Sequence, residues 1–257
     1  MQTVNSSYLK SLLKHAKAAQ IDISHLQSVA DEGRVIMEVQ EQFWRQLVAK
    51  SGDLLGYEFG KQLQPADLGI LGHILMTAAD FSQALQFLQD FYPLVGEGGV
   101  IKIERSHTYC SIIYIPQFDV AREVRVEAVL AGLINIGNQL TAAKLPIQRV
   151  DFDYEPQKSV QAAFANFTEC DIYPKQTLNR VIISSRCLTE PLYFANEEIV
   201  TSLLPNITQQ LSHLYSISPV KSAQHFIELS PGISRQELAQ SMQMSVRSLS
   251  RSLQQSG

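Results

Sequence analysis

The sequence predicts an α+β protein: a mostly helical N-terminal domain with a small antiparallel sheet, followed by an all-α segment. Three observations support this class. Apolar residues recur at three- and four-residue spacing over most of the first 95 residues, as amphipathic helices require. Alternation of apolar and polar residues replaces that spacing between residues 100 and 115. Two short amphipathic segments end the chain.

The composition is that of a folded chain outside the membrane. Of its 257 residues, 45% are hydrophobic and 18% are charged, which is enough to form a core. No apolar run approaches the roughly 20 residues of a membrane span, and basic residues interrupt the N-terminus where a signal peptide would be apolar. Three widely separated cysteines (Cys110, Cys170, Cys187) form no metal-binding spacing. We therefore expect free thiols, a cytoplasmic location and no membrane partner.

Helical spacing predicts a series of helices in the first 95 residues. The first helix covers residues 6–19, and a longer one covers residues 35–50. A short helix is expected between them, through Leu26 and Val29, and a turn is expected at 65–72. Two further helices are predicted at 71–77 and 81–93.

The middle of the chain predicts the sheet. Alternation over 100–115 indicates a β-hairpin, and further strands are predicted at 147–154 and 180–184. Helices are expected at 120–140, 156–167 and 196–215. A linker at 216–219 would then divide the chain into domains 1–215 and 216–257. The glycine cluster at 96–99 suggests a phosphate cradle, but it lacks the preceding strand and following helix of that motif.

The last segment, residues 230–257, has the pattern of a helix-turn-helix. Ser234 and Glu237 form a capping box for its first helix, and Ser245 can cap the second. The apolar residues of each helix share one face: Ile233, Leu238, Ala239 and Met242 on the first, and Val246, Leu249 and Leu253 on the second. The alternative interpretation is a solvated helical hairpin packed on a larger domain.

In a helix-turn-helix the second helix enters the major groove of DNA. Its apolar stripe leaves Arg247 and Arg251 free for base or phosphate contacts, with Ser245, Ser248 and Ser250 in support. The formal net charge of the chain is −4, whereas from Ser218 onward basic residues outnumber acidic ones by two. A mildly basic end on an acidic body is consistent with double-stranded DNA as a partner.

The C-terminal motif resembles the first helix-turn-helix of AraC/XylS-type bacterial transcription regulators. The matching elements are Leu238-Ala239, Met244-Ser245, the run from Arg247 to Leu253, and Gly257. The sequence departs from the family at the turn, where Gln243 replaces the usual glycine. The family continues with a connecting helix and a second helix-turn-helix. The resemblance therefore implies that a chain stopping at Gly257 carries about half of a DNA-binding domain, as a truncated product would, and binds its promoter weakly or not at all.

Two N-terminal stretches are similar to the effector domain of AraC-type regulators often described as arabinose-binding-like. The first is 68–95, with the Gly69-Ile70-Leu71-Gly72-His73 start, Phe81 to Leu85, and Tyr92. The second is 162–196, with Phe167, Cys170 to Ile172, Asn179 to Val181, and Leu188 to Leu192. The resemblance implies a domain that senses a small-molecule effector and forms a homodimer. Sugars, amino acids, fatty acids and cyclic nucleotides all remain open as effectors.

A pocket for such an effector needs a few polar anchors in an apolar wall. The candidates chosen as ligand-binding residues are His73, Tyr92, Arg122 and Arg125. Arginine offers a bidentate fork to a carboxylate or phosphate, although surface ion pairs are the alternative role for both arginines. Tyr92 and His73 have core positions as their alternative. Trp44, His107 and Tyr114 were also considered.

The sequence contains no constellation typical of an enzyme or a metal site. The six histidines form no HxxxH or HExxH pair, and no GxSxG motif occurs. Glu123 and Glu127 are one helical turn apart but lie among arginines, which predicts a solvated helix face. We therefore expect no catalysis, no metal and no cofactor. The alternative to a DNA-binding regulator is a ligand-sensing, dimerising protein without DNA binding of its own.

Overall fold

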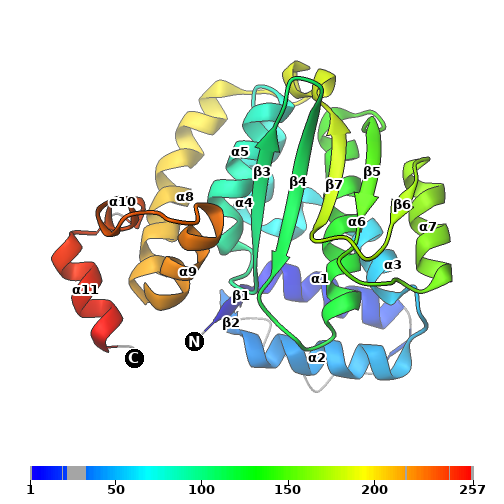
Figure 1. Ribbon diagram of the computed structural model, residues 1–257, viewed down its shortest axis with the longest axis horizontal. Coiled ribbons are helices and arrows are strands. Elements are labelled where there is room, and N and C mark those ends of the chain that lie inside the picture. The colour runs from blue at the N-terminus through cyan, green and yellow to red at the C-terminus, as the bar shows by residue number, and fades with distance from the viewer. Residues whose placement is uncertain (1, 19, 22–32, 218, 243, 256–257) are drawn as a thin grey trace.

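The computed structural model describes residues 2–18, 20–21, 33–217, 219–242 and 244–255, and is centred on a five-stranded sheet (Figure 1). The strand order is β3-β4-β7-β5-β6. β3 and β4 form the predicted hairpin, β4 and β5 both pair with β7 in antiparallel fashion, and only β6 is parallel to its neighbour β5. The bounds are Gly99–Arg105 (β3), Tyr109–Pro116 (β4), Ile147–Asp151 (β5), Ile172–Tyr173 (β6) and Asn179–Ser184 (β7). The predicted α+β class is confirmed.

Helices cover one face of this sheet. α5 (Phe81–Phe91) contacts β3, and α6 (Arg122–Thr141) contacts β4 and β7. α4 (Ile70–Thr77) packs on α5, after the short 3-10 helix η2 (Pro65–Leu68). Asp80 caps α5 by accepting a hydrogen bond of 2.8 Å from the Gln83 amide. These helices lie where the apolar spacing predicts them.

α3 (Leu55–Gln62) is a helix that the sequence analysis did not predict. Gly56 and Gly60 lower its intrinsic helix propensity, yet both are needed where it packs against α6. A Cβ atom at Gly56 would lie 2.1 Å from the Val124 carbonyl oxygen, and one at Gly60 would lie 2.2 Å from that of Ala128. Tertiary packing therefore stabilises a helix that its own residues favour weakly.

The N-terminus folds beside the lower end of the sheet in the view of Figure 1. α1 (Ser6–Ala18) and α2 (Met37–Lys50) confirm two predicted helices. Each follows a short strand, β1 (Thr3–Asn5) and β2 (Arg34–Ile36), and these strands pair in a separate two-stranded sheet. The predicted helix through Leu26 and Val29 lies outside the described residues.

The second half of the domain adds α7 (Lys158–Thr168), the 3-10 helix η4 (Ser185–Thr189) and α8 (Glu197–Ile217). Strand β5 ends at Asp151, three residues before its predicted end. The predicted linker at 216–219 is wrong for its first two residues, because both belong to α8, and the next helix begins at Pro219. Among the described residues, no helix combines the length and hydropathy that a membrane span requires.

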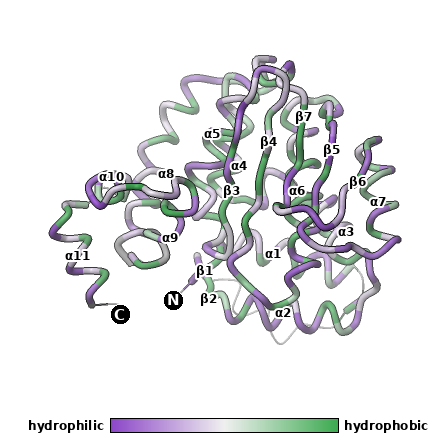
Figure 2. Tube along the Cα trace, in the orientation of Figure 1, coloured by the Kyte–Doolittle hydropathy of each residue, from purple (hydrophilic) through white to green (hydrophobic). Residues whose placement is uncertain are grey.

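The C-terminal helices α9 (Pro219–Leu229), α10 (Arg235–Ser241) and α11 (Val246–Gln255) pack around a small core of their own. Its buried members are Ala223, Leu238, Ala239, Met242 and Leu249. Hydrophobic and hydrophilic residues alternate along α11 in Figure 2. Val246, predicted to share the buried face with Leu249, is instead 41% exposed, because only one turn of so short a helix points fully into this core.

Candidate functional site

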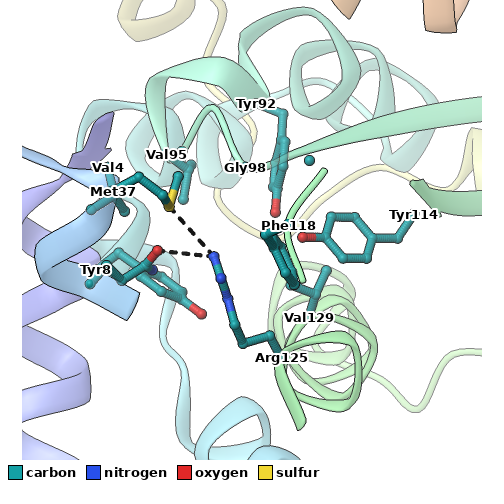
Figure 3. A pocket seen from close by; sticks show the side chains of 13 residues that line it. Val4, Tyr8, Met37, Tyr92, Val95, Gly98, Tyr114, Phe118, Arg125 and Val129 are labelled. Atoms are coloured by element: carbon teal, nitrogen blue, oxygen red, sulfur yellow. Dashed lines mark hydrogen bonds between the residues drawn. The ribbon is translucent and has the colours of Figure 1, made fainter. Parts of the chain in front are cut away.

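A cavity of about 40 Å³ lies where the N-terminal elements meet the end of the sheet (Figure 3). Its walls come from β1, α1, α2, β4, α6 and the segment between α5 and β3, which includes the 3-10 helix η3 (Tyr92–Leu94). Apolar and aromatic side chains with a few polar groups line it, as in a small-molecule site. The lining residues are Val4, Tyr8, Met37, Gln40, Tyr92, Val95, Gly96, Gly98, Gly99, Tyr114, Phe118, Arg125 and Val129.

Arg125, from the first turns of α6, is the polar centre of this pocket. Its side chain lies over the Phe118 ring, with the guanidinium carbon 3.3 Å from the ring centroid. One terminal nitrogen donates to Gln40 Oε1 at 3.1 Å and contacts Met37 Sδ at 3.5 Å; the other donates to the Val120 carbonyl at 3.3 Å. Arg125 is only 4% exposed. Burial lowers its pKa, but an arginine remains protonated in proteins.

Three tyrosines surround the guanidinium. Tyr8 comes from α1, Tyr92 from η3 and Tyr114 from β4. The rings of Tyr92 and Tyr114 meet edge to face, with centroids 6.2 Å apart. Burial raises the pKa of all three hydroxyls, that of Tyr114 to about 12. Each therefore keeps its proton at neutral pH, and the Tyr92 hydroxyl donates a hydrogen bond to that of Tyr114.

The glycine cluster forms one wall, at the start of β3. A Cβ atom at Gly99 would lie 2.5 Å from Tyr114 Cε2, and one at Gly98 would lie 2.9 Å from Met37 Cε. At Gly96 the nearest atom, on Val4, would be 3.5 Å away, which is ordinary contact. Gly98 and Gly99 thus let the backbone approach the aromatic and arginine side chains closely.

The structure brings together two of the four residues chosen as ligand-binding, Tyr92 and Arg125. His73 lies exposed on α4 and does not line the pocket. Arg122 lies outside it as well, because it forms an ion pair with Asp153, with NH1 donating to Oδ1 at 3.0 Å. Arg122 thus forms the surface ion pair that is the alternative role for both arginines, whereas Arg125 is buried, with Glu41 Oε1 4.0 Å from its NH1 atom.

Of the three further candidates, Tyr114, Trp44 and His107, one lies in the pocket and two do not. Tyr114 lines the pocket. Trp44 is fully buried in the core, edge to face with Phe59, and His107 is exposed. Tyr8, Gln40 and Phe118 were not among the predicted residues, because they come from three segments that only the fold joins. The one local signal was the glycine cluster.

Glu127 corrects the expectation of a solvated helix face on α6. It is 3% exposed, and its Oε1 accepts a hydrogen bond from the Tyr154 hydroxyl at 3.1 Å. Its Oε2 is buried and has no hydrogen-bond partner. Burial raises the pKa of this carboxyl to about 8. Among the described residues, no cluster of three His, Cys, Asp or Glu side chains could hold a metal ion.

The C-terminal helices have the local geometry that the sequence indicates. The capping box of α10 is present, with the Glu237 amide donating to Ser234 Oγ at 3.2 Å and the Ser234 amide to Glu237 Oε2 at 2.9 Å. Ser245 Oγ accepts from the Ser248 amide at 3.1 Å, and the two hydroxyls are 2.8 Å apart. Arg247 and Arg251 on α11 are exposed, and Ser250 is partly buried.

The described chain combines an α+β domain that contains the Arg125 pocket with a small helical bundle that carries exposed arginines. Residues 12–192 match the family model described as the arabinose-binding domain of AraC transcription regulator, N-terminal. The chain therefore belongs to this family of transcription regulators.

The fold is also that of a solved regulator. The crystal structure of the transcriptional regulator CdpR from Pseudomonas aeruginosa superposes with a TM-score of 0.63 at 16% sequence identity. The match covers 98% of this chain and 79% of that one. At this identity the likeness concerns the fold alone. No curated protein sequence matches the chain.

Proposed function

We propose that this protein is a cytoplasmic transcription regulator that senses a small-molecule effector in the Arg125 pocket and reads promoter DNA through α11. The observation that supports this most is the position of the segment 96–99. Gly99 lines the Arg125 pocket and also a second cavity, of about 10 Å³, between the effector domain and the C-terminal helices.

This second cavity gives the effector a route to the output. It is lined by Glu97 on one side and by Tyr215 and His225 on the other, and α9 contacts β3. A ligand that shifts the 96–99 backbone would alter the surface on which α9 rests. The effector would then favour one arrangement of the C-terminal helices over another.

DNA reading rests on the exposed side of α11. Arg247 and Arg251 are one turn apart, so both can face the same groove. Ser245 and Ser248 bond to each other at the start of the helix, so their proposed role is to position that end against a phosphate. Ser250 is the remaining polar side chain proposed for contact with the bases.

The test is a selection of binding sites from a random DNA library at low salt, which strengthens the weak binding expected of a single helix-turn-helix, followed by fluorescence anisotropy on the enriched duplex. Replacing Arg247 and Arg251 together with Ala should weaken binding at least tenfold and reduce its salt dependence, because phosphate or base contacts are lost. The matched control is Arg45→Ala, since Arg45 is exposed on α2, far along the chain from α11. Enrichment that survives the double substitution would contradict the proposal.

An exposed aromatic pair favours the second candidate function, a sensor that acts by dimerising without binding DNA itself. Tyr193 and Phe194 are 76% and 62% exposed, and Ile199 at the start of α8 is also exposed. We propose this patch as the homodimer contact. Sedimentation should show a dimer that Tyr193→Ser with Phe194→Ser converts to a monomer. A dimer that enriches no DNA would favour this second function, and a wild-type monomer would exclude it.

A further inference from the structure

We propose that the Arg125 pocket binds a small monocarboxylate, with the carboxylate on the guanidinium and a short apolar or planar group against the pocket walls. This inference rests on the proposed sensing function, and it names the chemical class of the effector. Three properties of the pocket lead to it: its charge, its excess of hydrogen-bond donors and its size.

The charge of the pocket is positive. Arg125 is the only charged residue among those that line it. The nearest acidic partner, Glu41, is 4.0 Å from the Arg125 NH1 atom, lies outside the lining and is also within 3.9 Å of Arg45. A buried cation with so distant a partner is incompletely compensated, and an anion in the pocket would pair with it.

The hydrogen-bonding groups of the pocket are mostly donors. The guanidinium, the protonated hydroxyls of Tyr8 and Tyr114 and the Gln40 amide nitrogen can offer protons, the Tyr92 hydroxyl donates to Tyr114, and no Asp or Glu is part of the lining. A sugar hydroxyl both donates and accepts, so a sugar also needs acceptors in its site, whereas a carboxylate only accepts. Although the family is described as arabinose-binding, this lining suits a carboxylate better than a sugar.

The size limits the charged group. A volume of about 40 Å³ compares with the roughly 10–15 Å³ that one water requires on the same measure. The pocket thus admits a head group of a few atoms. A phosphate dianion would bring two charges to a single arginine, and a monocarboxylate brings one. Val4, Val95, Val129 and Phe118 provide apolar surface for the rest of the molecule.

The experiment compares acids with their own amides. Acetate, butyrate and benzoate are titrated beside acetamide, butyramide and benzamide, with arabinose and inorganic phosphate as further probes, by thermal shift and calorimetry. Each acid and its amide have nearly the same shape and differ in charge. We expect at least one acid to raise Tm by about 2–4 °C near saturation, and its amide to leave Tm unchanged.

Two variants locate the effect. Arg125→Met should weaken carboxylate binding at least tenfold. Gln40→Glu places a permanent carboxylate beside Arg125, where Gln40 Oε1 now lies 3.1 Å away. Gln40→Glu should raise Tm in the absence of ligand and abolish the response to the acids. Because this variant should be more stable than the wild type, its loss of binding could not be attributed to a loss of folding. Arg122→Gln is the control, because Arg122 pairs with Asp153 outside the pocket, and it should keep the affinity within about twofold.

Several outcomes would overturn the inference. An amide or arabinose that binds as tightly as the acids would show that the pocket does not recognise a carboxylate charge. Acid binding that persists in Arg125→Met and Gln40→Glu would show that the acids bind elsewhere. Phosphate binding more tightly than every acid would exclude the monocarboxylate. No response to any acid at tens of millimolar would do the same. The DNA selection tests the regulator separately, so failure of the two ideas can be told apart.

Discussion

Glu97 and His225 line the same small cavity from opposite sides of the boundary between the effector domain and the C-terminal helices. Each has an unpartnered buried atom there, Oε1 of Glu97 and Nε2 of His225. The other carboxylate oxygen of Glu97 is held by the Thr3 amide and hydroxyl, at 2.8 and 2.6 Å. The boundary therefore combines a carboxylate that Thr3 holds in place with a buried histidine whose Nε2 atom has no hydrogen-bond partner.

We predict that the buried His225 contributes a loss of stability as pH falls from about 6.5 to 4, a contribution opposite in sign to that of the buried Glu127 carboxyl. Burial lowers the pKa of this histidine to about 4 in the folded state, against 6.5 when unfolded. Between these values the unfolded chain binds the extra proton, so stability rises with pH, by up to about 1.4 kcal/mol per pH unit. Urea unfolding of the wild type and of His225→Gln at several pH values measures this slope as the difference between the two proteins, because the Glu127 contribution is common to both.

The variants separate burial from the carboxylate. His225→Gln should remove the part of the slope that rises with pH in that window and leave the opposite contribution of Glu127. Glu97→Gln should leave the rising part largely in place, because burial and not Glu97 sets the histidine pKa. Tyr215 and Ser222 also line the cavity, and neither changes charge in this window. A rising part that persists in His225→Gln would refute the assignment to this residue.

Alanine substitutions in the glycine cluster should differ sharply in cost. Gly99→Ala should destabilise the fold by about 1–3 kcal/mol, because its Cβ would lie 2.5 Å from the Tyr114 ring. Gly98→Ala should cost less, since its closest neighbour is the flexible end of Met37. Gly96→Ala is the control and should stay within about 0.5 kcal/mol.

A double-mutant cycle checks the cause of the Gly99 effect. Combining Gly99→Ala with Tyr114→Leu removes the ring that the new methyl group would meet, so the two costs should not add. Denaturant unfolding of the four proteins gives the coupling energy. Additive costs would mean that the tyrosine is not what limits position 99.

The sequence predicts well those elements that bury one regular face. α5, α6 and the β3–β4 hairpin are examples, because their apolar residues repeat at the helical or strand period. α3 escapes prediction because its fit to α6 requires Gly56 and Gly60, residues that locally oppose a helix. Gly56 and Gly60 are one helical turn apart, but small residues that allow a close approach do not form the apolar stripe from which a helix is predicted.

Only part of the pocket was predicted from the sequence, because its lining residues come from segments that are brought together by the fold. Tyr92 was predicted as a polar anchor, and Arg125 was predicted because arginine offers a bidentate fork to a carboxylate or phosphate. Tyr8 and Gln40 reach the pocket only because the β1–β2 pairing brings α1 and α2 to the end of the sheet. Arg122 and Arg125 are equivalent in the sequence, and only the fold sends one to Asp153 and the other into the core.

Glu127 should give the opposite pH dependence to His225. Its pKa is about 8 in the folded state and 4.5 in the unfolded chain, so the folded state holds the extra proton between these values. Its contribution is fully present below about 4.5 and is lost as pH rises through 8. Tyr154, Glu123 and Asp53 are the titratable groups that face it.

The amide variant tests this directly. Glu127→Gln mimics the protonated acid, so it should match the wild type near pH 5 and be more stable above pH 8. Glu123→Gln is the matched control one turn away and should keep most of the slope, because burial is the main cause of the raised pKa. The Glu127 contribution is the difference in stability between the wild type and Glu127→Gln at each pH. A difference that does not change between pH 5 and 9 would contradict the assignment.

The contact between α3 and α6 should tolerate no side chain at position 60. In Gly60→Ala the new methyl group would lie 2.2 Å from the Ala128 carbonyl oxygen, and helix backbone cannot move as a side chain can. The helices must separate, which should cost about 1–3 kcal/mol even though alanine is the better helix former. Gly52→Ala, with no atom within 4 Å of its new methyl group, should be neutral. Because α6 also carries Arg125, Gly60→Ala should weaken ligand binding together with stability. If it instead stabilised the chain, as helix propensity alone predicts, the close packing of these two helices would be disproved.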